Sequence, residues 1–581
     1  MNDRVPTRYL LIYILCIACL CGIGFAGLRN HPWSYDDLDH IEKAKSAQEN
    51  ITAIFAPEKT ALRLRFVLSF YFYAAYKVFG EEPTGYHILN ILLHVLNSLL
   101  CARLLLTLFS CPKLAALSGF LFAINTTHYE AIYWVSASAA LLGTGFALTT
   151  VLFFAKYLIS NRKVHLIVAS FAYAATIFSY ESLGVIFAII LLLWFQHKSK
   201  PRFKDIAILL PFLVFAALLF LINEIYYQNL PSNQEIYRPG LHIPYNFAFF
   251  VGRLFLNWSF APFGWEAGAP FDIPRAYFDW YAAAGLIILI GLGYAAYQSK
   301  TICFATVWIL MTILPYTLWD NYSYFPRYWY CPAIGGATVL AAFLLWFFSI
   351  IPLSSRIKFA CFSPIIICLT ILSLRKMEIY EGYYLWHDAN FYQSPNHKKD
   401  PKTSIKYYER VLSEYKLKFS LLTNNLGVSY QQVGDLDKAL QMYYETIQID
   451  PDYNKGILNY ANALFLKHRF SESVQVFSVV AKRNPAHVHH IKKLGIFLYQ
   501  RGEINAAIQF FRLIVKTDPK NEQNYFILGV LFHTKGKIED AISAYKQALS
   551  INPEHANTRT ILESLLANPE MSAPELEFQS Q

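Results

Sequence analysis

Four prolines near the C-terminus recur at intervals of 34 residues, at Pro451, Pro485, Pro519 and Pro553. Each proline closes a segment whose eighth and twentieth positions are small and whose twenty-fourth position is aromatic. Numbered from residues 420, 454, 488 and 522, these positions hold Gly427, Ala461, Gly495 and Gly529, then Ala439, Ser473, Ala507 and Ala541, then Tyr443, Phe477, Phe511 and Tyr545. Small residues let two helices approach closely, and the aromatic ring fills the contact with the next pair. The period therefore predicts an α-helical solenoid.

This pattern resembles the tetratricopeptide repeat, and we assign four repeats to 420–453, 454–487, 488–521 and 522–555. The fifteenth position suits a turn between helices, because it holds Gly434, His468, Gly502 and Gly536. Upstream, residues 403–415 resemble the second helix of a degenerate first repeat, and the stretch after Pro553 resembles a capping helix. The repeat domain is therefore predicted over 403–568, followed by a disordered polar tail over 569–581.

Arrays of such repeats commonly hold an extended peptide or a partner helix on their concave face. We therefore expect the array to capture an acceptor protein or a partner peptide. The alternative is that the array docks another subunit and never meets a substrate.

The chain before residue 376 has a different character. Of the 581 residues, 55% are hydrophobic and only 15% are charged, and the apolar excess is confined to this part. The predicted fold class is all-α: a polytopic transmembrane helical bundle over 1–376, a linker over 377–402 and the repeat solenoid. About 11 spans are expected, at 10–28, 86–108, 112–125, 137–158, 163–178, 183–197, 205–226, 279–298, 301–319, 329–350 and 357–375.

Two further apolar stretches, 61–80 and 244–263, are interrupted by polar residues, and we expect them to lie in the membrane interface. The run 10–28 is long for a cleaved signal core, so we expect it to be retained as the first span. The lipid bilayer is thus the first predicted partner.

Short basic loops set the orientation of the bundle. They fall on the side of Arg4 and Arg8, which is therefore cytoplasmic, and they comprise 161–163, 198–204, Lys300, and Arg356 with Lys358. An odd number of spans places the repeats on the opposite side. The predicted location is a bacterial inner membrane with the repeats in the periplasm, or a eukaryotic secretory membrane with luminal repeats.

The formal net charge of +10 is explained by these loops and does not imply nucleic acid as a partner. All nine cysteines lie in or beside apolar segments without metal-ligand spacing. They are typical of small hydrophobic residues rather than of a disulfide framework.

Ionisable residues gather at the external ends of the predicted spans. They are Asp36, Asp37 and Asp39 after the first span, His128 and Glu130 after the third, Glu181 after the fifth and Arg327 after the ninth. Such residues are costly at span ends unless they are paired or hydrated. Their gathering on one face predicts a site, with ordinary loop residues near water as the alternative.

The residue types suggest the chemistry of that site. Asp36 and Asp37 could act together as a general base and its orienting group, or could hold a divalent cation, and the sequence leaves both readings open. Arginines can cradle a phosphate through forked hydrogen bonds, and the candidates are Arg327, Arg63, Arg65 and Arg253. A phosphate at the bilayer surface indicates a lipid-linked donor. Arg63 and Arg65 could instead be interfacial anchors.

A polar stripe runs along the predicted span at 86–108, because His87, Asn90 and His94 share one helix face. The stripe either touches substrate or bonds neighbouring helices.

The chain resembles the transmembrane-and-tetratricopeptide O-mannosyltransferases and, more broadly, the GT-C glycosyltransferases that use polyprenyl-phosphate sugars. The matching islands occur in the family's order. They are Tyr35-Asp36-Asp37, the run from Gly85 to His94, His128-Tyr129-Glu130-Ala131 with Trp134, Glu181 before Gly184, and Arg327-Tyr328-Trp329-Tyr330 with Pro332 and Gly335.

The resemblance implies an inverting transfer of a sugar from a polyprenyl phosphate to a hydroxyl group. It assigns catalysis or metal binding to Asp36 and Asp37, and substrate binding to His128, Glu130, Glu181, Arg253, Arg327, Tyr328, His87 and His94. The chain departs from the family at Tyr180, where a basic residue is expected, and at Ser138 and Ala140, where a charged pair is expected.

The predicted function is therefore glycosyl transfer from a polyprenyl-phosphate sugar to a hydroxyl acceptor, expected to be a protein, at the external face. The alternatives are a repeat-bearing ligase or polymerase of the O-antigen type, and a non-enzymatic membrane scaffold that recruits partners through its repeats. An O-antigen enzyme would be expected to carry a long external loop with Arg and His. The sugar, the acceptor class and the need for a divalent cation are left open.

Overall fold

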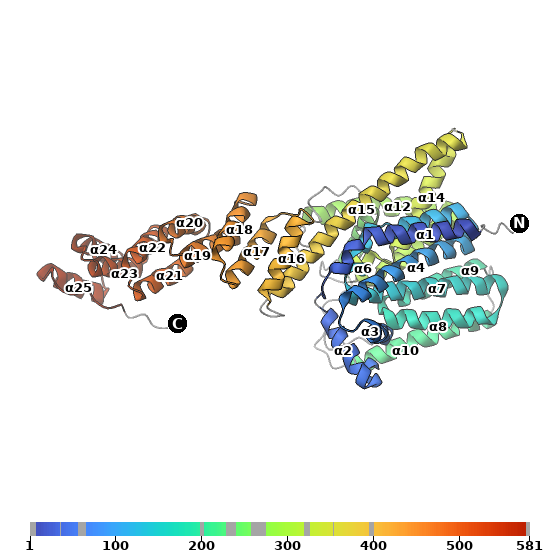
Figure 1. The fold of residues 1–581 in the computed structure, drawn as a ribbon, viewed down its shortest axis with the longest axis horizontal. Coiled ribbons are helices and arrows are strands. Elements are labelled where there is room, and N and C mark those ends of the chain that lie inside the picture. Colours follow the sequence, from blue (N-terminus) through green and yellow to red (C-terminus); the bar gives the residue numbers. More distant parts are fainter. Residues whose placement is uncertain are drawn as a thin grey trace. The chain divides into compact units, whose positions relative to one another are not determined.

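The computed structural model describes residues 7–34, 36–55, 65–197, 203–227, 240–256, 275–318, 326–352, 354–393 and 400–576. Every regular element in these residues is helical, as the sequence predicts (Figure 1). The chain divides into two compact units, Met1–Asp388 and Ala389–Gln581. Arg4, Arg63 and most of the basic loop 198–204 lie outside the described residues.

The helices of the first unit coincide closely with the predicted apolar runs. The ones that matter below are α1 (Thr7–Gly24), α2 (Asp37–Glu49), α3 (Phe66–Phe79), α4 (Pro83–Phe109), α5 (Pro112–Ala123), α6 (Tyr129–Tyr133), α7 (Ser138–Ser160) and α8 (Lys163–Ser179). They continue with α9 (Ile186–His197), α10 (Leu210–Tyr227), α11 (His242–Leu256), α12 (Arg275–Gln298), α13 (Lys300–Thr317), α14 (Ala333–Ile350) and α15 (Ser355–Gln393). Short 3₁₀ turns join several of them, and these carry much of the site.

The number of long apolar helices is smaller than the predicted number of spans. Among the described residues, six helices are long and apolar enough to cross a membrane: Pro83–Phe109, Val135–Ser160, Asp279–Gln298, Lys300–Thr317, Ala333–Ile350 and Arg356–Gln393. The prediction of about 11 spans counted apolar runs without regard to where helices end. Helix α5 shows the reason, since Pro112 opens it and it ends after 12 residues, which is roughly 18 Å against a hydrocarbon core of about 30 Å.

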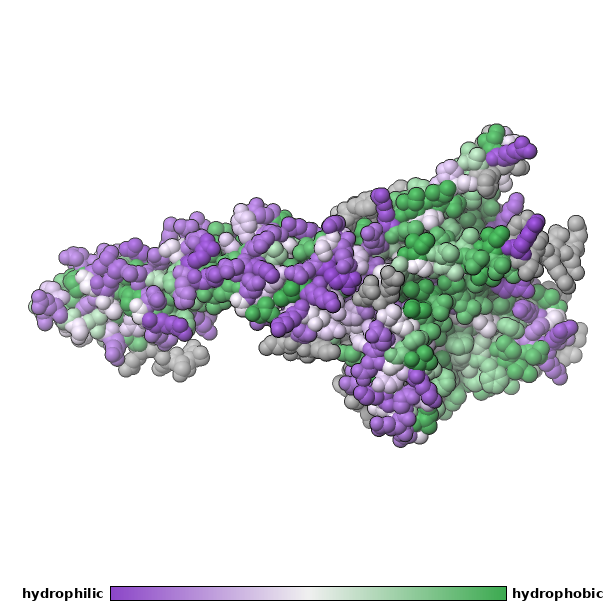
Figure 2. All heavy atoms as spheres, viewed as in Figure 1, coloured by the Kyte–Doolittle hydropathy of each residue, from purple (hydrophilic) through white to green (hydrophobic). Residues whose placement is uncertain are grey.

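Shorter apolar helices account for most of the difference. They are Leu10–Gly24, Phe66–Phe79, Pro112–Ala123, Lys163–Ser179, Glu181–His197 and Ile206–Leu221. Apolar side chains cover much of the outer surface of the first unit (Figure 2). Large exposed ones include Leu92, Ile167, Phe171, Ile287, Ile290 and Trp346. This surface is compatible with membrane insertion.

Helix α15 departs from the predicted boundary and linker. It continues past residue 376 through Gln393, as one helix of 39 residues. Met377, Glu381, Leu385 and Asp388 recur at helical spacing and are buried. The polar composition of this segment suggested a linker, but its polar residues face the interior of the first unit. The structural boundary therefore lies at Asp388.

The second unit stacks helix pairs as the period predicts. After α16 (Pro401–Ser413) come α17 (Ser420–Gln432) with α18 (Leu436–Ile449), α19 (Asn454–Leu466) with α20 (Phe470–Arg483), α21 (Val488–Gln500) with α22 (Ile504–Thr517), α23 (Glu522–Thr534) with α24 (Ile538–Ile551), and finally α25 (Ala556–Ala567). The predicted contact between small and aromatic positions is tight. A Cβ on Gly529 would lie 2.6 Å from the Tyr545 ring.

The turns inside the repeats need a left-handed residue. Gly434, Gly502 and Gly536 have φ of 86°, 76° and 74°, and His468 occupies the same position with φ of 58°. The last described segment, 568–576, does not behave as a disordered tail. Met571 and Leu576 pack on the core of the repeats.

Candidate functional site

The loop after α1 carries two acids at the start of α2, and they play different parts. Asp37 is 1% exposed. Its Oδ2 accepts from the Ser34 N–H at 2.8 Å, and its Oδ1 accepts from the N–H and Oγ–H of Ser136 at 2.7 and 2.5 Å. Burial raises the pKa of Asp37 to about 7, although the hydrogen bonds from Ser136 and Ser34 act to lower it. Asp37 therefore ties the first loop to the loop before α7.

Asp36 is half-buried and leaves its carboxylate available. It is the N-cap residue of α2 but makes no side-chain capping bond. Within the described residues no hydrogen bond or ion pair engages this carboxylate. Burial raises its pKa, while the charge of Arg327 lowers it and that of Asp39 raises it again. Asp36, rather than Asp37, is thus the acid whose carboxylate is available to an acceptor.

Arg327 lies in the turn Pro326–Trp329 and is held by Glu130 of α6. The Arg327 backbone N–H donates to Glu130 Oε2 at 2.7 Å, and its Nη1 donates to Oε1 at 3.1 Å. The guanidinium also lies over the Trp134 ring, 4.7 Å from the centroid. Because the Glu130 side chain is 6% exposed, its negative charge is committed to this pair.

Glu181 is committed in the same way. Arg65 Nε and Nη2 donate to its two carboxylate oxygens, both at 2.9 Å. The Arg65 guanidinium lies 5.1 Å from the centre of the Tyr180 ring, so this tyrosine lies beside a cation.

The loops after α1, α5, α8 and α13 therefore converge. Asp36 lies within the electrostatic reach of Arg327, and Tyr180 within that of both Arg327 and Arg65. Arg327 itself pairs with Glu130. Tyr328 supports this assembly from inside the fold, because it is 5% exposed and stacks on Tyr316 at 4.3 Å.

The three histidines face the interior instead. His128 is enclosed by Phe122, His94 and Tyr330, with ring centroids 4.4, 5.1 and 4.6 Å away. His94 Nδ1 contacts the Tyr330 hydroxyl at 2.9 Å and its Nε2 donates to the Ala123 carbonyl at 3.0 Å. The latter tautomer follows because a carbonyl oxygen only accepts.

The polar stripe of α4 bonds neighbouring helices. Asn90 donates to the Ile132 carbonyl at 3.1 Å and accepts from the Tyr71 hydroxyl at 3.0 Å. His87 is 1% exposed, and its ring lies 6.2 Å from that of Tyr133. Of the two readings of the stripe, the structure supports bonding between helices for Asn90 and His94.

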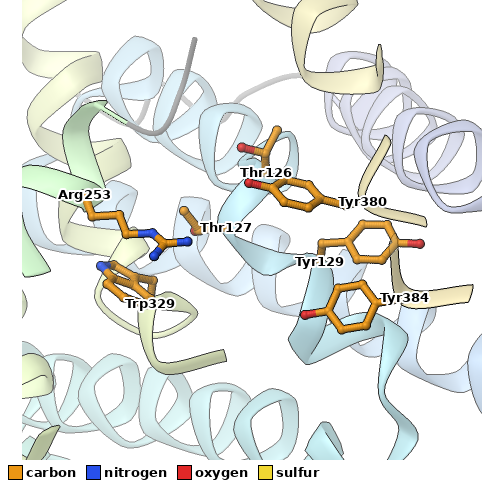
Figure 3. A pocket seen from close by; sticks show the side chains of 7 residues that line it. All are labelled: Thr126, Thr127, Tyr129, Arg253, Trp329, Tyr380 and Tyr384. Atoms are coloured by element: carbon orange, nitrogen blue, oxygen red, sulfur yellow. The ribbon is translucent and has the colours of Figure 1, made fainter. Parts of the chain in front are cut away.

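A small cleft of about 10 Å³ opens beside the loops after α5 and α13 (Figure 3). Arg253 of α11 points into it, and the wall is completed by Thr126, Thr127, Tyr129, Trp329, Tyr380 and Tyr384. Arg253 is 9% exposed and lies over the Trp329 ring at 5.0 Å. Among the described residues it has no carboxylate partner and no hydrogen bond. Arg253 is therefore the buried cation whose charge is not neutralised there.

Glycines fix the position of Arg253. A Cβ on Gly252 would lie 1.9 Å from the Tyr281 carbonyl oxygen, and a Cβ on Gly285 would lie 1.7 Å from that of Ala248. Helices α11 and α12 thus touch backbone to backbone, as small residues allow in membrane proteins. The cleft lies near the Glu130–Arg327 pair, because Glu130, Arg327 and Arg253 all act electrostatically on Tyr384.

A buried ionic cluster was not predicted. His31 Nδ1 contacts the Tyr133 hydroxyl at 2.8 Å and its Nε2 contacts Glu381 Oε1 at 3.3 Å. Asp388 accepts from Ser34 Oγ at 2.6 Å and from the Tyr133 hydroxyl. Burial acts to lower the pKa of His31, but the bonds to Asp388 and Glu381 outweigh it and raise this pKa. The helical spacing of Glu381, Leu385 and Asp388 was the available signal.

A divalent cation held by Asp36 and Asp37 stays a prediction. Both oxygens of Asp37 already accept hydrogen bonds. Across the part of the chain that the structure describes, no three His, Cys, Asp or Glu side chains are arranged to hold a metal ion.

Comparison with known proteins concerns the second unit. Residues 423–453 and 522–555 match models of the tetratricopeptide repeat, which correspond to α17–α18 and α23–α24. The chain thus carries tetratricopeptide repeats in its C-terminal region, which are consistent with a protein or peptide partner. No curated protein matches the chain.

Several solved structures share the repeats at low similarity. YrrB, a TPR protein with an unusual peptide-binding site, is 16% identical; the match covers 31% of this chain and 90% of that chain, with a TM-score of 0.22. A MamA protein is 18% identical over 30% of this chain and 94% of that one, with a TM-score of 0.23. MamA 41-end from Desulfovibrio magneticus RS-1 is 20% identical over 26% and 85%, with a TM-score of 0.18.

Proposed function

We propose that the chain is a membrane glycosyltransferase that moves a sugar from a polyprenyl-phosphate donor to a hydroxyl acceptor. The reaction would take place at the external face of a bacterial inner membrane or of a secretory membrane. In this proposal about 11 apolar segments, including the shorter helices, cross the membrane. The observation that supports the proposal is that Asp36 lies within the electrostatic reach of Arg327, while Arg253, a buried cation without a carboxylate partner among the described residues, lines the cleft formed in part by the loops after α5 and α13.

Asp36 has the properties of a general base. Its raised pKa brings its basicity closer to what deprotonation of a hydroxyl requires, and no structural bond competes for its carboxylate in the described residues. In the proposed step the carboxylate takes the acceptor proton. The acceptor oxygen then attacks the anomeric carbon, and the bond from that carbon to the phosphate oxygen breaks with inversion.

Arg253 has the properties of a phosphate ligand. The leaving polyprenyl phosphate takes the electron pair of the broken bond, and a largely buried guanidinium stabilises that charge better than a fully hydrated one. Arg327 and Arg65 are less suited, because Glu130 and Glu181 neutralise them. Thr126 and Tyr384, which both carry hydroxyl groups, line the same cleft.

Kinetics of sugar transfer by the purified protein, with polyprenyl-phosphate sugars as donors, test this assignment. Arg253→Lys keeps the positive charge but loses the forked hydrogen-bonding geometry of the guanidinium, so we expect at least a tenfold rise in donor KM. Lys45→Ala is the matched control, since Lys45 is exposed and pairs with Glu81 at 3.0 Å. An unchanged donor KM for Arg253→Lys would contradict the phosphate role.

The non-enzymatic scaffold is the second candidate, because the repeats are the part of the chain with matched relatives. It predicts that Asp36 and Arg253 variants leave partner binding by the repeats intact and that no sugar transfer depends on them.

A further inference from the structure

The last described residues fold back onto the repeats. After α25, the segment 568–576 leaves the solenoid end and returns along α23 towards α21 (Figure 1). Met571 and Leu576 pack on the hydrophobic core of the repeats, and both are half-buried. Between them, Ala573 and Pro574 are half-buried while Ser572 and Glu575 are exposed.

Two side chains of the repeats bind the backbone of this segment. His533 Nε2 lies 3.0 Å from the Met571 carbonyl oxygen, and the Leu576 N–H lies 3.4 Å from the Tyr499 hydroxyl oxygen. A carbonyl oxygen only accepts, so His533 must carry its proton on Nε2. Because the hydrogen bonds go to backbone groups of the segment rather than to its side chains, they favour an extended conformation without selecting a particular peptide sequence.

The two contacting residues are equivalent. Tyr499 and His533 are 34 residues apart and hold the twelfth position of the third and fourth repeats, on the first helix of each. The first helices of two successive repeats therefore contact the same extended segment through polar side chains at equivalent positions. His533 is 4% exposed.

We propose that residues 569–576 are an internal ligand of the repeats, covering a surface on α21 and α23 that accepts an extended peptide. The partner that fits has two apolar side chains five residues apart, small residues or proline between them, and a free backbone carbonyl for His533. Because the segment is tethered to α25, its local concentration is on the order of millimolar. A partner must therefore displace it, and the repeats stay closed to weak competitors. This inference does not depend on glycosyl transfer.

The test measures binding of a fluorescein-labelled synthetic peptide with the sequence of residues 568–581 to the full-length protein in detergent micelles. Three proteins are compared: the wild type, a chain ending at Asn568, and the full chain with Met571→Asp and Leu576→Asp. We expect the second and third to bind the peptide at least tenfold more tightly than the wild type. Ser572→Asp is the matched control, because Ser572 is exposed and its substitution should leave residues 569–576 bound to the repeats.

Outcomes of this experiment are decisive in both directions. Peptide binding by the shortened chain and by the doubly substituted chain that is no tighter than binding by the wild type would overturn the proposal. The substituted full chain guards against a folding defect in the shortened one. Amide hydrogen exchange is an independent test. The Leu576 amide should exchange slowly in the wild type and at least tenfold faster in the His533→Ala variant. Equal exchange rates in the two proteins would also overturn the proposal.

Discussion

Glu130 binds Arg327 twice, through the backbone N–H at 2.7 Å and through the guanidinium at 3.1 Å, although the two residues are 197 positions apart. The pair joins the loop after α5 to the loop after α13. It also leaves Arg327 without a charge to spare for a ligand.

Substitution of one partner should cost more than substitution of both. Glu130→Gln leaves a largely buried guanidinium without its counter-charge, so we expect a loss of roughly 3 kcal/mol in unfolding free energy. The double variant Glu130→Gln with Arg327→Met removes that charge and should recover part of the loss. Thermal unfolding of the detergent-solubilised protein measures both. A double variant that is less stable than Glu130→Gln would contradict this account.

Stability should fall as the pH rises from 5 to 8. The pKa of Asp37 is raised from 3.8 to about 7, so the folded state holds this proton more tightly than the unfolded state, and stability is lost between about pH 4 and 7. At 1.36 kcal/mol per pKa unit, this loss amounts to roughly 4 kcal/mol at most. The raised pKa of His31 acts with the same sign, since its stabilisation is complete below 6.5 and is lost as the pH passes its folded pKa.

Unfolding temperatures at pH 5, 6, 7 and 8 check this dependence. Asp37→Asn should flatten the profile below pH 7, and His31→Gln should flatten it above pH 6.5. A wild-type profile that rises over this range would show that these buried groups do not titrate as described.

Substitution by alanine should lower the unfolding temperature at one glycine of the N-terminal region and not at another. A Cβ on Gly27 would lie 1.4 Å from Glu381 Oε1, whereas a Cβ on Gly22 would meet nothing within 4 Å. Gly27→Ala must therefore move the Glu381 carboxylate away from His31, and we expect a fall of several degrees in unfolding temperature. Gly22→Ala is the matched control and should stay within about 0.5 kcal/mol of the wild type. Equal unfolding temperatures for the two variants would contradict the close approach of α15.

Much of the fold follows from local sequence patterns. Apolar runs bounded by proline or glycine place the helices well; for example, the span predicted at 163–178 is α8 (Lys163–Ser179). The repeats are placed equally well, because small and aromatic residues recur with a fixed period. Helix length is less predictable, since α5 stops after 12 residues and α15 continues for 39.

The site is only partly predictable. The sequence groups Asp36, Glu130, Glu181 and Arg327 at one end of the bundle, and the structure brings their loops together. It cannot say which acid of an adjacent pair is engaged, because Ser136 reaches Asp37 from 99 residues away. His31 and Glu381 are 350 residues apart, so no local pattern connects them. Arg253 stands out only once Arg327 and Arg65 are seen to be paired.

The most direct test of the account is mass spectrometry of glycans from membranes and exported proteins of cells that produce Asp36→Asn in place of the wild type. Glu49→Gln is the control, since Glu49 is exposed at the C-terminal end of α2. We predict that Asp36→Asn reaches the membrane with an unchanged unfolding temperature and that the dependent glycoforms fall at least 100-fold, as loss of a general base implies. A glycan profile identical to that of the wild type, with Asp36→Asn present at normal amounts, would contradict the transferase function.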